Sequence, residues 1–280
     1  ASIQDKYVTV SVHKKNIDDA RVYFSRVGAE LITKFNRLGS KCTELDAVQR
    51  LRIIHDFFRT GEETYFHFDL KDRMRKGHSF RDYVCPDNYE NHSDHFKIGN
   101  RYGRVLLLRD YASYIKDSMV AELTDINRNL MLSIDEVPVP TDEAVKEVEQ
   151  RLLGVETNIT NWQRKQNMNN NFSAVVPYDM EQQRKESKDF RDDLTTRDQR
   201  MMFAVITIVH TADTKKQLDE DTESIMTTAR KHLCQMSVLK FQQLDGLKTS
   251  LPFGVRKIDA FRTLTTESLA VFMPFRVQEV

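Results

Sequence analysis

The chain has 280 residues, of which 40% are hydrophobic and 30% are charged, so it is long enough to bury a sizeable core. Its 42 basic residues balance 42 acidic ones, which excludes an overall basic field of the kind that attracts nucleic acid or anionic lipid. Three widely spaced cysteines indicate a reducing cytoplasm rather than a disulfide framework, and no apolar run has the length of a membrane-spanning helix.

The first third of the sequence predicts two helices flanked by short strands. Asn16 is predicted to be a helix N-cap. Asp18 and Asp19 follow it, and their negative charges are favourable near the positive end of the helix dipole. An apolar stripe at steps of three and four then runs to Leu38, where Gly39 stands as a C-terminal glycine. The expected elements are a strand over residues 7–13, helices over 17–38 and 44–58, a strand over 64–68, and an unassigned polar stretch over 71–91.

The rest of the sequence alternates strands with helices. Pro138 and Pro140 end a strand, Thr141 is expected to cap the long helix that follows, and Asp213 to cap a later one. The expected elements are a hairpin of strands 96–98 and 102–109 that turns at Gly99-Asn100, a helix over 118–123, a strand over 129–137, a helix from 141 to at least 162, a polar run over 166–171, a helix over 179–193, a clearly buried strand over 201–210, a helix over 213–233, a strand over 235–241, a loop over 249–254 and a last strand over 269–275.

This order of elements predicts an α+β fold with a ferredoxin-like antiparallel sheet and long helices packed on one face. Three parts are expected: a partial N-terminal α+β subdomain over 1–94, the ferredoxin-like subdomain over 95–254, and a C-terminal connection over 255–280. The chain begins within a strand pattern and ends directly after an apolar run, so we expect it to be a segment of a longer protein.

A search for catalytic motifs finds little. A phosphate-binding G-x-x-x-x-G-K-[ST] loop is absent, and the nearest run, GNRYG at 99–103, predicts a hairpin turn. Cys234 lies close to His232, but a free cysteine is more often a small core residue than a nucleophile. His210 ends an apolar strand, where a local hydrogen bond is the simplest role, and Trp162 is expected in the core.

The clustered histidines offer a metal-binding alternative. His78, Cys85, His92 and His95 fall in the polar stretch, but only His92 and His95 have a spacing that suits a zinc ion. A polar surface loop with scattered histidines is the competing interpretation. Because no motif is complete, the sequence assigns no catalytic, cofactor-binding or metal-binding residue.

Charged clusters give no stronger signal. The acidic groups are expected on solvated faces. They are Asp135 and Glu136, Asp192 and Asp193, and Glu220, Asp221 and Glu223. Basic residues near aromatic ones suggest a nucleic-acid contact, although acidic neighbours dilute both groups. These candidates are Arg101, Tyr102, Arg104 and Arg109, and the run 184–191.

Several collinear stretches resemble one family. They are YGRVLLL at 102–108, ELTD at 122–125, DDLTTRDQ at 192–199, the strand at 201–210 with Ala212-Asp213, ARKHLCQ at 229–235, SLPFG at 250–254 and LTTESLAVFMPF at 264–275. Together they are similar to the TrsE/TraE-like conjugal transfer ATPases of Gram-positive mobile elements, which belong to the large VirB-type (CagE/TrbE) ATPases of type IV secretion.

The resemblance implies an architecture and a role. In that family a long α+β region precedes a RecA-like ATPase domain, and the Walker motifs lie downstream of the stretch that resembles 264–275. ATP and Mg would then belong to that domain, and no catalytic residue carries over to this chain. The resemblance implies a cytoplasmic scaffold, peripheral at the cell membrane, that docks the ATPase onto inner-membrane secretion components and helps its subunits to form oligomers. The rival functions are a metal-dependent enzyme and a DNA-binding module.

Overall fold

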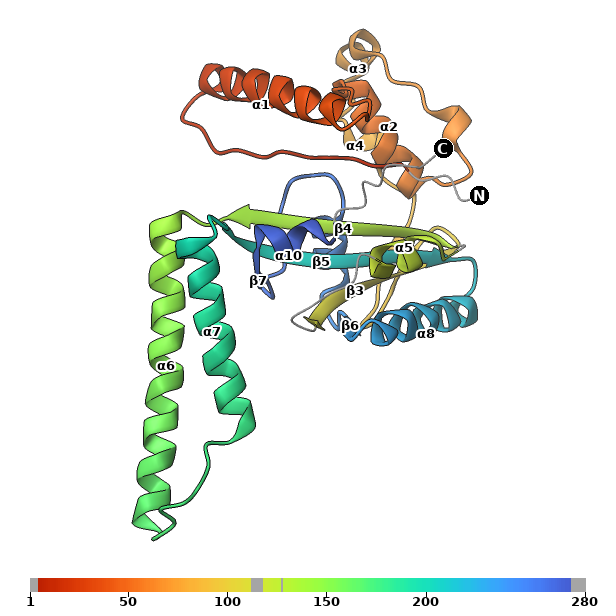
Figure 1. Ribbon diagram of the computed structural model, residues 1–280. Coiled ribbons are helices and arrows are strands. Elements are labelled where there is room, and N and C mark those ends of the chain that lie inside the picture. Colours follow the sequence, from red (N-terminus) through yellow and green to blue (C-terminus); the bar gives the residue numbers. More distant parts are fainter. Residues whose placement is uncertain (1–4, 112–117, 127, 273–280) are drawn as a thin grey trace.

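The computed structural model describes residues 5–111, 118–126 and 128–272, which form a mixed sheet-and-helix body with a long helical hairpin projecting from it (Figure 1). Seven strands form one antiparallel sheet within these residues. The strands are β1 (Tyr89–Asn91), β2 (Phe96–Ile98), β3 (Arg101–Tyr111), β4 (Asn129–Pro138), β5 (Met201–Ala212), β6 (Cys234–Val238) and β7 (Arg262–Thr265). The helices are α1 (Ile17–Arg37), α2 (Ala47–Phe58), α3 (Leu70–Lys76), α4 (Arg81–Val84), α5 (Ser118–Thr124), α6 (Thr141–Met168), α7 (Tyr178–Thr196), α8 (Lys215–Lys231), α9 (Gln243–Ser250) and α10 (Thr266–Ala270).

The central four strands have ferredoxin-like topology. Along the chain they follow the order β3, α5, β4, then β5, α8, β6, and in the sheet they lie in the order β6, β3, β5, β4 with every neighbour antiparallel. The two crossover helices, α5 and α8, contribute Val120 and Ile225 to the same hydrophobic cluster on one face. The predicted α+β class is therefore confirmed.

Both faces of the sheet are covered. In β3, Leu106 and Leu108 face the cluster of α5 and α8, while Val105 and Leu107 face a second cluster with α9. This alternation explains why the strand reads as a continuous apolar run rather than as a half-buried strand. The second face also receives aromatic side chains from the C-terminal end of α2, so residues from the N-terminal part of the chain complete the core.

The hairpin of α6 and α7 interrupts the unit between β4 and β5. At a rise of about 1.5 Å per residue, a helix of 28 residues extends roughly 42 Å. Only its base joins a hydrophobic cluster of buried residues, in which Ala144, Val148 and Leu194 pack with Met201 of β5. Beyond the base, α6 and α7 pack on each other. The apolar stripe of each helix therefore contacts the other helix and not the sheet. The sequence predicted that long helices pack on one face of the sheet. For α6 and α7 this prediction is wrong, because the hairpin projects from the sheet.

Two predicted strands do not join the sheet. Residues 7–13 and 64–68 lie outside every strand, and a 3₁₀ turn at Glu63–Tyr65 occupies part of the second range. Alternation alone does not make a strand, because each strand needs a hydrogen-bonding neighbour. Residues 71–91, unassigned from sequence, hold α3, α4 and β1.

The C-terminal predictions differ in a similar way. The expected strand at 235–241 ends at Val238, and α9 then takes in Thr249 and Ser250, which the sequence places in a loop. In place of a strand over 269–275, the chain forms β7 and then α10, whose N-cap Thr265 accepts a hydrogen bond from Ser268 N–H; residues 273–275 lie outside the described residues. A short apolar run fits a buried helix as well as a strand.

The predicted N-cap is confirmed for α1 and lies one residue away from the observed one for α6 and α8. Asn16 caps α1 as predicted, and Gly39 has a positive φ of 74°. At α6 the cap position is Pro140, with no side-chain hydrogen bond from Thr141, and at α8 the cap is Thr214 rather than Asp213. Each shift is one residue, the usual uncertainty of a helix end.

Two glycines provide a matched test of the packing. A Cβ at Gly103 would lie 2.2 Å from the ring of Phe96, whereas a Cβ at Gly154 in α6 would meet nothing within 4 Å. We expect Gly103→Ala to lower the free energy of unfolding by about 2 kcal/mol through overpacking. Gly154→Ala should raise it by about 0.5–1 kcal/mol, because alanine favours the helix. Urea unfolding measures both; a neutral Gly103→Ala variant would mean that β2 and β3 do not pack as described.

Candidate functional site

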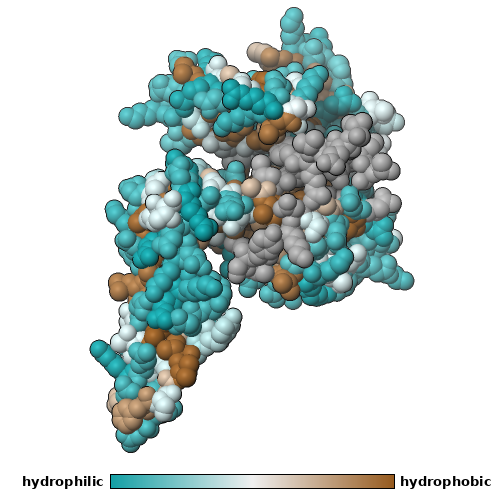
Figure 2. All heavy atoms as spheres, viewed as in Figure 1, coloured by the Kyte–Doolittle hydropathy of each residue, from teal (hydrophilic) through white to brown (hydrophobic). Residues whose placement is uncertain are grey.

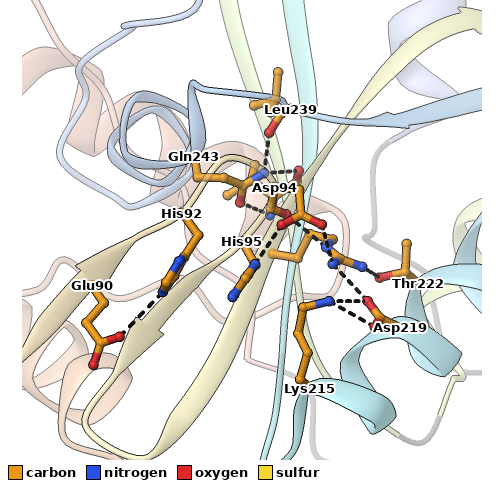
Figure 3. A network of polar contacts seen from close by, with 11 residues as sticks. Glu90, His92, Asp94, His95, Lys215, Asp219, Thr222, Leu239 and Gln243 are labelled. Atoms are coloured by element: carbon orange, nitrogen blue, oxygen red, sulfur yellow. Dashed lines mark hydrogen bonds and ion pairs between the residues drawn. The ribbon is translucent and has the colours of Figure 1, made fainter.

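A buried polar network lies between β3, α8 and the turn before β2 (Figure 3). At its centre the Arg104 guanidinium, 4% exposed, donates to the backbone oxygen of Asp94 at 2.9 Å and to its carboxylate at 3.0 Å. The same guanidinium lies 2.9 Å from the Asp219 carboxylate, which also accepts from Lys215. Hydrogen bonds from Lys215 and Arg104 hold the pKa of Asp219 below its usual range. Burial opposes ionisation of Asp94, but His95 and the Arg104 charge lower its pKa on balance.

His210 extends this network into the sheet. It lies beside Arg104 in the β3–β5 register and is fully buried. The Thr222 hydroxyl donates to the Leu218 carbonyl at 2.8 Å, so it accepts from Arg104 and from His210 Nε2, at 2.8 and 3.0 Å. This assigns the proton to Nε2 and leaves the buried Nδ1 without a hydrogen-bond partner. Burial, with the Arg104 charge, lowers the His210 pKa to about 4, so the ring is neutral at physiological pH.

Gln243 replaces a missing strand neighbour. Its buried side chain accepts from Val105 N–H at 2.8 Å and donates to the Val105 and Leu239 carbonyls (Figure 3). Because β6 pairs with β3 only from Leu106 onward, the amide of Gln243 satisfies backbone groups at the end of that pairing. These contacts position β3 and fix the sheet; none of them presents a reactive atom to solvent.

The metal candidates are only partly brought together. The rings of His92 and His95 stack with centroids 4.4 Å apart, and they contact Glu90 and Asp94 respectively. His78 instead packs against Tyr83, and Cys85 is exposed. Within the part of the chain that the structure describes, no group of three or more His, Cys, Asp or Glu side chains is placed to hold an ion.

The run GNRYG forms the β2–β3 hairpin turn, as predicted, with Gly99 at a φ of 57°. Beside it is an open pocket of about 300 Å³ whose lining includes three phenylalanines and the arginines Arg59 and Arg101. Arg59 is paired with Glu62 and Asp87, and Arg101 donates to Thr211. The charges among the lining residues are balanced, two arginines against Glu62 and Asp87, so the pocket does not select an anion.

The remaining sequence candidates are held in structural contacts. Cys234 is buried, its sulfur lies 3.6 Å from the His232 backbone oxygen, and burial raises the pKa of its thiol to about 11, which disfavours the nucleophilic thiolate. The His232 ring lies 3.2 Å from Glu122 instead. Trp162 is only partly buried on α6, contrary to its expected place in the core, because that part of α6 lies beyond the sheet.

The charged clusters divide between surface and interior. Asp221 is 3% exposed and accepts from Arg128 and Gln217, so the predicted solvated face is wrong for this residue. Asp135 is paired with Arg256, while burial, reinforced by Asp135, raises the pKa of the Glu136 carboxyl.

Most basic candidates for nucleic-acid binding already have contacts within the chain. Arg104 is buried in the network, Arg109 donates to Ser237, and Arg184 and Lys188 each lie near Glu156. A phosphate backbone would have to compete for these groups.

β4 forms an outer edge of the sheet. β4 pairs only with β5 among the described residues. Val139 N–H donates to the Met201 carbonyl at 2.9 Å, one step beyond the Pro138–Met202 pair. In an antiparallel ladder the odd-numbered residues of β4 therefore bond to β5, and the backbone groups of the even-numbered ones point outward. These are Leu130, Leu132, Ile134, Glu136 and Pro138.

Pro138 agrees with this register. Proline has no N–H and is tolerated where that group would face away from the sheet. The outward N–H groups thus belong to the four residues before it, over a strand of ten residues. The prolines that end this strand were visible in the sequence, but its edge position depends on a sheet order that the sequence does not state.

Comparison with known proteins identifies no family for this chain. The chain matches no model of a known protein family, and no curated protein matches its sequence. Among the described residues, no helix combines the length and the apolar character needed to cross a membrane.

Proposed function

We propose that the chain is the non-catalytic N-terminal scaffold of a type IV secretion ATPase that drives conjugative DNA transfer. In this role it docks the ATPase onto membrane channel components and onto neighbouring subunits. The observation that carries the proposal is the open edge of β4, a ten-residue strand whose outward backbone groups are available for a partner strand. The resemblance of the collinear stretches is the support for naming this parent protein.

The β4 edge suits strand addition. An incoming extended segment would take its affinity from main-chain hydrogen bonds and its specificity from alternate side chains. Leu130, Leu132 and Ile134 lie at the border of the cluster beneath α5 and α8 and are only partly buried, so a partner strand would extend the covered apolar surface. Glu136 is exposed and brings a carboxylate to one end of the edge, which disfavours indiscriminate pairing, while the Asp135 carboxylate is paired with Arg256.

The rest of the molecule supports a positioning role. The strongest polar constellation, around Arg104 and His210, is buried within the sheet and α8. It fixes the orientation of β3 and β5 and therefore of β4, which pairs along β5. The isolated chain is expected to show no ATP turnover; activity that persists through rigorous purification would argue against the proposal.

A proline variant tests the edge directly. Glu136→Pro removes an outward N–H without touching the ladder to β5, whereas Glu136→Ala removes the side chain alone. In capture experiments with the channel proteins and the ATPase domain, we expect Glu136→Pro to weaken binding at least about tenfold and Glu136→Ala to leave it nearly unchanged.

Thermal unfolding serves as the control, since both variants should melt close to the parent chain. Equal loss of binding in both variants would assign the effect to the carboxylate and not to the backbone edge. Wild-type binding to none of these proteins would contradict the proposed function itself.

A further inference from the structure

The far end of the α6–α7 hairpin exposes large apolar side chains. We define residues 157–178, which include the end of α6, the connecting turn and the first residue of α7, as the distal hairpin. Figure 2 shows hydrophobic atoms gathered on this part of the projection, well away from the body. The exposed fractions are 84% for Met168, 75% for Phe172, 86% for Val175 and 78% for Tyr178. Exposed apolar side chains this close together in a projecting element indicate a contact surface.

The charge of the distal hairpin is one-sided. Its only charged residues are Arg164 and Lys165, in a chain where 30% of all residues are charged and the two signs balance. Both side chains are exposed, and neither has an ion pair among the described residues. Two arginines nearer the base are paired, Arg151 with Glu147 and Arg184 with Glu181, while Lys146 and Lys185 have no ion pair among the described residues. Even with exposed Asp179 directly after Tyr178, the two free cations leave this end of the hairpin net positive, which complements an anionic partner.

We propose that the distal hairpin binds the surface of an anionic lipid bilayer. Phe172, Val175 and Met168 would enter the boundary between headgroups and acyl chains, where burial of apolar side chains is favourable. Trp162 and Tyr178 belong to the residue types that concentrate at this depth, and Arg164 and Lys165 would meet the lipid phosphates. This lipid contact is separate from the protein contacts at β4 and does not depend on them.

The geometry favours a bilayer over a second copy of the chain. Two distal hairpins brought together would oppose Arg164 and Lys165 with their own copies and supply no carboxylate to balance them. The connection between the helices begins with Asn169, Asn170 and Asn171, and Asn170 adopts a φ of 58°, a conformation that asparagine tolerates. The connection over residues 169–177 carries no charged side chain, and the nearest exposed acid is Asp179, in the first turn of α7.

The test uses the single tryptophan of the chain, Trp162, which lies in the distal hairpin. The chain is mixed with vesicles of phosphatidylcholine alone, or of phosphatidylcholine and phosphatidylglycerol in equal parts. We expect sedimentation with the anionic vesicles only, a blue shift of the tryptophan emission, and weakening by added salt. Absence of both sedimentation and the blue shift with anionic vesicles would overturn the proposal.

Matched variants locate the contact. Phe172→Ser and Lys165→Glu should each weaken vesicle binding about tenfold, from lost apolar burial and from reversed charge. The control is Leu153→Ser, which removes a side chain 68% exposed on the same helix but outside the distal hairpin. Equal binding by all variants would place the lipid contact elsewhere. Loss of self-association or of protein capture in the first two variants, without vesicle binding by the parent chain, would assign the surface to a protein.

Discussion

Replacing Arg104 by methionine is expected to lower the free energy of unfolding by about 3 kcal/mol. The change removes a buried cation that contacts Asp94, Asp219 and Thr222 at once. Loss of one partner from a buried ion pair leaves an uncompensated charge, at a cost of about 3–5 kcal/mol. The expected loss of stability lies at the lower end of this range, because the carboxylates of Asp94 and Asp219 are 38% and 52% exposed and can be hydrated again.

Urea unfolding of the variant measures this effect, and Arg109→Met on the same strand is the control. Arg109 is exposed and has one hydrogen bond, to Ser237, so its replacement should change stability by no more than about 0.5 kcal/mol. Similar stabilities for the two variants would mean that the network around Arg104 does not hold β3 to α8.

Acidification is expected to destabilise the chain through His210. Its pKa is about 4 in the folded chain, because the ring is buried beside Arg104, and about 6.5 when unfolded. As the pH falls through the unfolded value, the unfolded chain binds a proton that the folded chain does not, so stability falls until the folded pKa is reached. This group alone should remove about 2 kcal/mol between about pH 7.5 and pH 5.

The comparison variant is His210→Gln, which retains a donor toward Thr222 but does not titrate. Urea unfolding at several pH values gives the free energy of unfolding of the parent chain and of the variant. The difference between them should change by about 2 kcal/mol between about pH 7.5 and pH 5. The carboxylates contribute equally to both chains and cancel in the difference. A constant difference would show that the pKa of His210 is the same in the folded and unfolded chains, so that burial does not disfavour protonation of the ring.

The sheet strands were the most predictable part of the fold. Residues 102–109 and 201–210 were predicted as strands, and they lie within β3 and β5, whose apolar side chains reach both clusters. The turn at Gly99 separates β2 from β3 as the glycine indicates. The antiparallel α+β arrangement then followed from the order of elements. Local patterns were less informative where a segment has no neighbouring strand to pair with. Residues 7–13 alternate like a strand, but they join no strand among the described residues.

The buried network could not be read from the sequence. Arg104 and His210 meet only because the sheet register sets them side by side, 106 positions apart in the chain. The sequence interpretation placed Arg104 among nucleic-acid candidates, since an arginine beside aromatic residues gives no sign that it will be buried. Asp221 was likewise expected in solvent, because helix charge runs usually face water, yet Arg128 and Gln217 stabilise it in the interior.

The two surfaces proposed for binding depend on shape as well as sequence. The apolar stripe of α6 predicted a long helix, but not that only its base would reach the sheet. The polar run at 166–171 marked a break, and the structure makes it part of a projecting tip. At β4, the prolines predicted the end of a strand, whereas the direction of its backbone groups required the register with β5.

Amide hydrogen exchange at β4 tests the proposed docking role most directly. The inward amides of Met131, Ser133 and Asp135 bond to β5 and should exchange slowly at all times. The outward amides of Leu132, Ile134 and Glu136 should exchange faster in the isolated chain and slow by at least about tenfold when the cognate channel proteins or the ATPase domain are added. Unchanged exchange of these outward amides in the presence of every such protein would contradict the proposal.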